Sequence, residues 1–180
     1  ATGSLVGGTI TVASGAEDRV NADVTYNQAR NEYLVVYQLV SPTTAGDIYA
    51  VRMTAGGAIL GGGEFGIAAW PDSEEDPAVG ASRVGDTYVV AWHNVLAGGD
   101  ENVYVRLVNG DGTIDGGPMQ IVGTSVSESD PDVACWHSST TCLVAWEHRY
   151  SNATGPIGVT ARTVDMDRSL GQYFTPRPIF

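Results

Sequence analysis

The sequence contains no lysine, and its nine basic residues are all arginine. Its 21 acidic residues give a formal net charge of −12, and no basic run interrupts them. Such a surface repels phosphate backbones and anionic membranes, which excludes nucleic-acid binding. Charged residues make up only 17% of the chain, against roughly 25% in an average globular domain. Low charge with abundant glycine, serine and threonine is typical of secreted all-β proteins.

Long hydrophobic runs are also missing from the 180 residues. The longest apolar stretches have five or six residues, far fewer than the roughly 20 that a membrane-spanning helix needs. The first residues are small and polar rather than a basic segment followed by an apolar one. We therefore expect no membrane insertion and a soluble, already processed chain, with enough apolar residues for one or two domains.

An internal repeat organises the sequence. Three apolar segments each end in a large aromatic residue, and these residues, Tyr37, Trp92 and Trp146, lie 55 and 54 residues apart. A valine upstream of each segment repeats with the same spacings, so the register is shared. Downstream, each repeat has an alternating segment that ends in arginine, then a turn and a last apolar segment. The arginine-ending segments are residues 48–52, 103–106 and 159–162.

Each repeat therefore holds four strand-like pieces, and their period-two alternation favours strands over helices. The order of pieces resembles the blades of extracellular β-propeller proteins: an Asp-Pro start, a second strand ending in Trp, a third ending in Arg and a Gly turn. We predict an all-β fold of three four-stranded antiparallel propeller-like blades with an extra N-terminal strand. The predicted second strands are residues 33–38, 88–93 and 142–147. The predicted units are an arm at 1–15 and a β domain at 16–180, with repeats at about 20–72, 73–127 and 128–180.

The N-terminal arm matches the last strand of a repeat. Twelve residues separate the last strand of each repeat from the first strand of the next, and Val12 lies 12 residues before Val24. Three blades are too few to close a propeller, which typically has four to eight. We therefore predict that the arm pairs with the sheet edge of an identical subunit. Its predicted residues are Leu5, Val6, Thr9, Ile10, Thr11, Val12 and Ala13. The alternatives are a tail packed on its own domain and a fragment of a longer multi-blade protein.

Two cysteines and one glycan acceptor indicate the compartment. Cys135 and Cys142 map by the repeat onto positions that face each other across a hairpin, so we predict a disulfide between them. Two unpaired thiols, or a metal bound together with His137, are the alternatives. Asn152 begins an Asn-Ala-Thr glycosylation sequon. A disulfide and a sequon predict an extracellular, secreted protein.

Sequence motifs of catalysis are missing, including metalloprotease spacing, a phosphate-binding loop and a nucleophile elbow. Acidic residues gather at the start of each repeat, at 17–18, 73–76 and 127–130. If the blades radiate, these residues meet on one face, where carboxylates could serve a glycosidase or hold Ca²⁺. A structural role is favoured, because Asp caps a turn and Pro presets φ. His93 is expected at a solvent-facing rim.

We therefore predict no catalytic residue, no metal, no cofactor and no enzyme activity. The predicted function is that of a structural subunit of an extracellular fibre or ring, assembled by head-to-tail stacking and strand exchange between identical subunits. The alternative is a carbohydrate- or ligand-binding propeller module, in which Trp70 and Trp136 stack on glycans.

Overall fold

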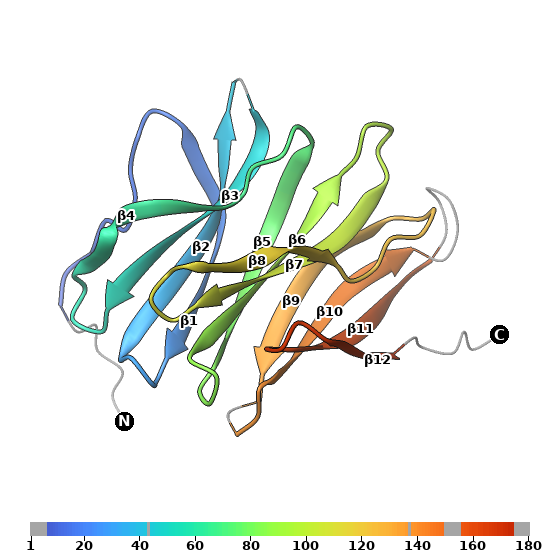
Figure 1. The fold of residues 1–180 in the computed structure, drawn as a ribbon. Coiled ribbons are helices and arrows are strands. Elements are labelled where there is room, and N and C mark those ends of the chain that lie inside the picture. The colour runs from blue at the N-terminus through green and yellow to red at the C-terminus, as the bar shows by residue number, and fades with distance from the viewer. Residues whose placement is uncertain (1–6, 43, 137, 150–155, 175–180) are drawn as a thin grey trace, which may run out of the picture.

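The computed structural model describes residues 7–42, 44–136, 138–149 and 156–174. These residues form three four-stranded antiparallel sheets that follow one another along the chain (Figure 1). The first sheet, blade 1, comprises β1 (Asp18–Asn27), β2 (Glu32–Ser41), β3 (Thr44–Thr54) and β4 (Ile59–Ala68). Blade 2 comprises β5 (Ser73–Ser82), β6 (Thr87–Val95), β7 (Glu101–Asn109) and β8 (Ile114–Gln120). Blade 3 comprises β9 (Glu128–Cys135), β10 (Thr141–Arg149), β11 (Ile157–Asp165) and β12 (Leu170–Phe174).

Each blade is a meander whose first strand is innermost. Strand β5 packs against both β1 and β9, so the first strands of the three blades lie side by side and the sheets radiate from them. The predicted all-β fold and the positions of the second strands are confirmed. Within the described ranges there is no helix long and apolar enough to span a bilayer.

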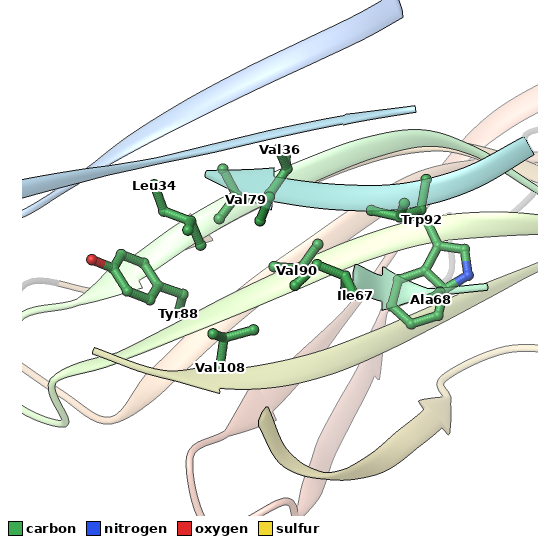
Figure 2. Close-up of a cluster of buried hydrophobic side chains, with 11 residues drawn as sticks. Leu34, Val36, Ile67, Ala68, Val79, Tyr88, Val90, Trp92 and Val108 are labelled. Atoms are coloured by element: carbon green, nitrogen blue, oxygen red, sulfur yellow. The ribbon is translucent and has the colours of Figure 1, made fainter. Parts of the chain in front are cut away.

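Two apolar layers hold the blades together. Because successive residues of a strand point to opposite faces, β6 serves both layers. Its residues Tyr88, Val90 and Trp92 pack against blade 1, as Figure 2 shows for the cluster that includes Leu34 and Val36. The alternate residues of β6 pack against blade 3, where Trp146 is buried. The repeated tryptophan of the second strand, Trp92 in blade 2 and Trp146 in blade 3, thus faces the preceding blade.

An arginine of each repeat links neighbouring blades, but the arginine of the first repeat bonds to the following blade and the other two bond to the preceding blade. Arg106 and Arg162 donate from Nη1 to a backbone carbonyl in or next to the preceding blade's fourth strand, at 2.5 and 3.0 Å. Arg52 does not share this position, because it pairs opposite Leu34, a residue that faces the next blade. It forms an ion pair with Glu32 at 2.6 Å, and its Nη1 donates to the backbone carbonyl of Asp111 in the next blade. The alignment of the three arginines across the repeats is therefore wrong for the first repeat.

No strand forms between residue 7 and β1, so the predicted N-terminal strand over Thr9 to Ala13 is absent from the single chain. Residues 10–13 instead line a groove on blade 1 together with Val35 and Tyr37. These two side chains occupy the repeat positions that in blade 2 pack on the preceding blade. The segment therefore packs on the apolar face of its own blade. Leu5 and Val6 lie outside the described residues.

The predicted disulfide between Cys135 and Cys142 is present. The two residues are cross-strand partners, as are Tyr26 and Tyr33 in blade 1. The repeat therefore placed the pair correctly. Asn152 and His137 lie outside the described residues.

Candidate functional site

Each innermost strand carries a β-bulge near its start. At each bulge one residue has a left-handed backbone: Asn21 (φ 51°), Asp76 (φ 47°) and Asp130 (φ 50°). They lie 55 and 54 residues apart, so they occupy the same position in each repeat. Among residues other than glycine, Asn and Asp tolerate this conformation best. Bulges redirect side chains, and such backbone strain is concentrated at functional sites.

These three residues form what we call the axial cluster, at one end of the innermost strands. Asn21 Nδ2 donates to Asp76 Oδ1 at 2.5 Å and to Gln38 Oε1 at 3.1 Å, which joins blades 1 and 2. Burial raises the pKa of Asp76; the electrostatic interaction with His93 opposes the rise, and the negative charge of Asp130 adds to it. The cluster therefore combines an exposed carboxylate in blade 3 with a half-buried carboxyl group in blade 2 that holds its proton more tightly than a free aspartate.

His93 lies beside this cluster and is only 4% exposed, so the expectation of a solvent-facing rim position is wrong. His93 alternates with Val89 and Ala91 on the face of β6 that packs against blade 3, so its ring lies between the two blades. The imidazole Nδ1 lies 3.9 Å from Asp76 Oδ2, and Nε2 lies 4.0 Å from Glu75 Oε2. Glu75, Asp76 and His93 form the one group of potential metal ligands found in the described part of the chain.

Two other acidic residues at the blade starts have a structural role. Glu74 and Glu128 are fully buried, and each accepts a hydrogen bond from the backbone N–H four residues earlier, at Trp70 (3.1 Å) and Thr124 (3.3 Å). Burial raises the pKa of Glu74 to about 7 and also raises that of Glu128, which lies 3.3 Å from His148 Nδ1. These two glutamates therefore hold the loops that lead into blades 2 and 3.

An open groove lies at the same end of the molecule, between blades 2 and 3. Its volume is about 420 Å³, and residues 98–101, 125–127 and Arg149 line it. Ser127 Oγ donates to Glu101 Oε2 at 2.6 Å across the two loops. The charge of Glu101 also raises the pKa of Asp76, so the groove and the axial cluster are electrostatically linked.

The two tryptophans predicted to stack on glycans differ in position. Trp70 packs edge-on against Trp92 and Tyr104, with ring centroids 6.0 and 5.1 Å apart, and so belongs to the apolar layer between blades 1 and 2. Trp136 is 66% exposed and lines a groove with Leu143, at the end of β9 remote from the axial cluster. A stacking role of either ring stays a prediction.

The bulges are the feature that sequence reasoning missed. The acidic residues and their spacing were visible, and the structure brings Asp76 and Asp130 into one cluster as expected for radiating blades. Glu74 and Glu128, which were expected on the same face, are instead buried and do not belong to the cluster. An Asn or Asp recurs at residues 21, 76 and 130, and these residue types favour a left-handed backbone. This recurrence is the sequence signal that could have revealed the cluster.

No protein-family model and no curated protein matches the sequence. Among solved structures, an endo-arabinase from Bacteroides thetaiotaomicron matches with TM-score 0.60 and 11% identity over 84% of this chain and 58% of that one. An α-L-arabinofuranosidase from Lactobacillus brevis matches with TM-score 0.61 and 12% identity, over 91% and 58%. A GH43 endo-arabinanase from Bacillus licheniformis matches with TM-score 0.53 and 10% identity, over 87% and 59%. This chain thus spans less than two thirds of their length, and the similarity establishes the propeller fold.

These comparisons contradict two predictions. These three similar structures are named as carbohydrate-cleaving enzymes and none as a structural subunit. Their names argue against the prediction of a fibre or ring subunit and against the prediction of no enzyme activity. The physical basis of the error is the N-terminal segment, which packs on its own blade instead of standing free. Association with identical subunits is not tested by a single chain and stays a prediction.

Proposed function

We propose that this propeller binds a neutral saccharide at the axial cluster and the adjoining groove. The observation that carries the proposal is the convergence of one left-handed Asn or Asp from each blade on one end of the innermost strands. Strained, bulged positions persist only where the surrounding structure holds them in place, and they are typical of binding and catalytic sites.

The chemistry of the site favours a neutral sugar over a charged ligand. Carboxylates such as Asp76 and Asp130 accept hydrogen bonds from sugar hydroxyls, and hydrogen bonds to charged groups are stronger than those between neutral groups. A net charge of −12 repels anionic polymers. The names of the similar structures support arabinose-containing glycans as the ligand class.

Hydrolysis of a glycosidic bond is a second candidate function. Glycosidases use one carboxylic acid to protonate the leaving oxygen and a second carboxylate as base or nucleophile. The raised pKa of Asp76 suits the first role, and Asp130 is the second carboxylate of the cluster. The enzyme names of the similar structures support this candidate.

An extracellular location accompanies the proposal. A disulfide is stable where the environment is oxidising, and Cys135 and Cys142 form one. Glycosylation at Asn152 is part of the same proposal.

Calorimetric titration of the 180-residue chain with linear arabino-oligosaccharides tests the proposal. We expect Asp76→Asn and Asp130→Asn to weaken binding about tenfold or more, since each removes a charge-assisted hydrogen bond worth roughly 1.5–3 kcal/mol. Asparagine keeps the left-handed backbone, as Asn21 does in blade 1. Asp115→Asn, at an acidic position in β8 outside the cluster, is the matched control and should bind as the parent does. Absence of binding by the parent chain, or unchanged binding by both cluster variants, would overturn the proposal.

A further inference from the structure

We propose that Glu75, Asp76 and His93 bind a divalent transition-metal cation at the start of blade 2. One ligand atom from each of the three residues lies within 4.8 Å of the other two. Ligand atoms about 2.0–2.2 Å from a shared Zn²⁺ lie roughly 3–4 Å from one another, so small side-chain movements would complete the site.

The buried imidazole is the first observation that supports a cation. The His93 residue is only 4% exposed, and its Nδ1 has no hydrogen-bond partner among the described residues. A buried polar atom without a partner costs free energy. Asp76 Oδ2 faces this nitrogen at 3.9 Å, too far for a hydrogen bond and suitable for two ligands of one ion.

The carboxylates are held as metal ligands usually are, with one oxygen fixed by a neighbour and the other left for the ion. Ser73 Oγ donates to Glu75 Oε1 at 2.7 Å, and Glu75 Oε2 is the oxygen nearer to His93. Asn21 Nδ2 donates to Asp76 Oδ1, and Asp76 Oδ2 is the oxygen nearer to His93. Both free oxygens therefore lie near the same ring, Asp76 Oδ2 beside Nδ1 and Glu75 Oε2 beside Nε2, and the Glu75 side chain must turn toward Nδ1 to share an ion with it.

The combination of ligands indicates the class of metal. An imidazole nitrogen favours Zn²⁺ and other transition metals, whereas Ca²⁺ and Mg²⁺ favour sites made of oxygen alone. Three protein ligands leave a coordination position open for water or for a sugar hydroxyl. A cation at this site also offsets the mutual repulsion among neighbouring carboxylates.

The repeat provides an internal comparison, because the other two blades lack this ligand set. Gln38 occupies the position of His93 in blade 1, and Glu147 occupies it in blade 3. Asn21 and Val20 replace the two carboxylates in blade 1. Only blade 2 combines an imidazole with two adjacent carboxylates at its bulge, so the set is specific to one blade and does not follow from the repeat itself.

The metal site shares Asp76 with the proposed saccharide site but does not depend on it. When the cation is bound, Asp76 serves as a ligand and cannot donate a proton, so metal binding and the hydrolytic candidate exclude one another at this residue. Saccharide titrations of metal-free and Zn²⁺-treated protein therefore test the proposed function separately from the metal site.

The experiment is a calorimetric titration of the chelator-treated full chain with ZnCl₂, followed by Co²⁺ absorption spectra. We expect one saturable site and an intense visible Co²⁺ band, typical of four- or five-coordinate Co²⁺, that His93→Gln removes. Two variants, His93→Gln and Glu75→Gln, should each weaken Zn²⁺ binding by more than about 10–100-fold, because that is the loss when only an outer-shell partner of a ligand is removed. Glutamine at position 93 copies the residue of blade 1. His148→Gln removes the histidine beside Glu128 and should leave Zn²⁺ binding unchanged.

Circular dichroism of each variant establishes that it is folded, and Glu75→Gln, at a half-exposed side chain, keeps the test decisive if His93→Gln does not fold. Absence of saturable Zn²⁺ binding by the parent chain would overturn the proposal. Unchanged binding by the folded Glu75→Gln variant, or tighter binding of Ca²⁺ than of Zn²⁺, would also overturn it. Saccharide binding by metal-free protein together with a negative metal result would leave the proposed function standing and reject the metal site.

Discussion

Replacing Glu74 by glutamine tests how burial governs stability at the start of blade 2. The side chain is fully buried, and its Oε2 accepts a hydrogen bond from the Trp70 N–H at 3.1 Å. The Asn94 side-chain amide, with its NH₂ turned toward Glu74, donates to Oε1 at 3.2 Å. Burial raises the pKa of Glu74 from 4.5 to about 7. Glutamine keeps an acceptor for the Trp70 N–H and removes the charge. Its NH₂ group replaces the oxygen that accepts from Asn94, so the Asn94 amide must turn its oxygen toward it. The pH dependence of the effect then separates the cost of ionising the buried carboxyl group from this change in hydrogen bonding.

The sign follows from proton binding. Between pH 4.5 and about 7 the folded chain holds the Glu74 proton while the unfolded chain releases it. The free energy of unfolding therefore falls as the pH rises through this window, and the loss is complete above it. A pKa difference of this size corresponds to at most about 3 kcal/mol. At pH 8 we expect Glu74→Gln to be more stable than the parent by about 1–3 kcal/mol, and near pH 4.5 we expect no gain.

Urea unfolding at pH 4.5, 6 and 8 measures this difference directly. For a chain of this size, 1 kcal/mol corresponds to a melting-temperature change of about 2–4 °C, so thermal scans provide an independent readout. Glu17→Gln, at an exposed residue, is the control and should change stability little at any pH. The reasoning is refuted if Glu74→Gln is less stable than the parent at pH 8, or if its stability relative to the parent does not depend on pH.

Three further predictions concern packing and strain. Gly80→Ala should destabilise the fold by about 1–3 kcal/mol, because the added Cβ would lie 2.7 Å from Cys135 Sγ; urea unfolding measures it, and an unchanged midpoint contradicts it. Arg106→Met should cost about 1–3 kcal/mol, since it leaves a backbone carbonyl of blade 1 without its donor; a melting temperature equal to that of the parent would count against this role. Reducing the bond between Cys135 and Cys142 should cost less than the roughly 3 kcal/mol of a 15-residue loop, because only seven positions separate the cysteines; unfolding with and without reductant decides it.

The strands could be predicted because their determinants are local. Alternation and the aromatic residue that ends each second strand recur every 54 to 55 residues, so the repeat placed all three sheets. The face of Arg52 could not be placed, because Arg52 lies three residues beyond Tyr49, the partner of Tyr37, whereas Arg106 lies two residues beyond the corresponding Tyr104. The two arginines therefore point to opposite faces of their sheets. The N-terminal segment had the spacing of a strand, but spacing does not supply a neighbouring sheet edge.

The candidate site was only partly visible in the sequence. Acidic residues at the start of each repeat predicted that carboxylates would gather, and Asp76 and Asp130 do. Neighbouring residues of a strand point to opposite faces, which is why Glu74 is buried whereas Glu75 lies beside His93. A bulge directly after Glu75 interrupts this alternation, so the sequence pattern could not assign the faces. The burial of His93 depends on the strands packed around it, which residue type and position do not specify.

A crystal structure of the chain soaked with an arabino-oligosaccharide tests the central claim most directly. The account predicts sugar hydroxyls within hydrogen-bond distance of the Asp76 or Asp130 carboxylate, with the rest of the ligand in the groove lined by residues 98–101 and Arg149. Sugar bound only at the exposed Trp136, or no sugar bound at a saturating concentration, would contradict it.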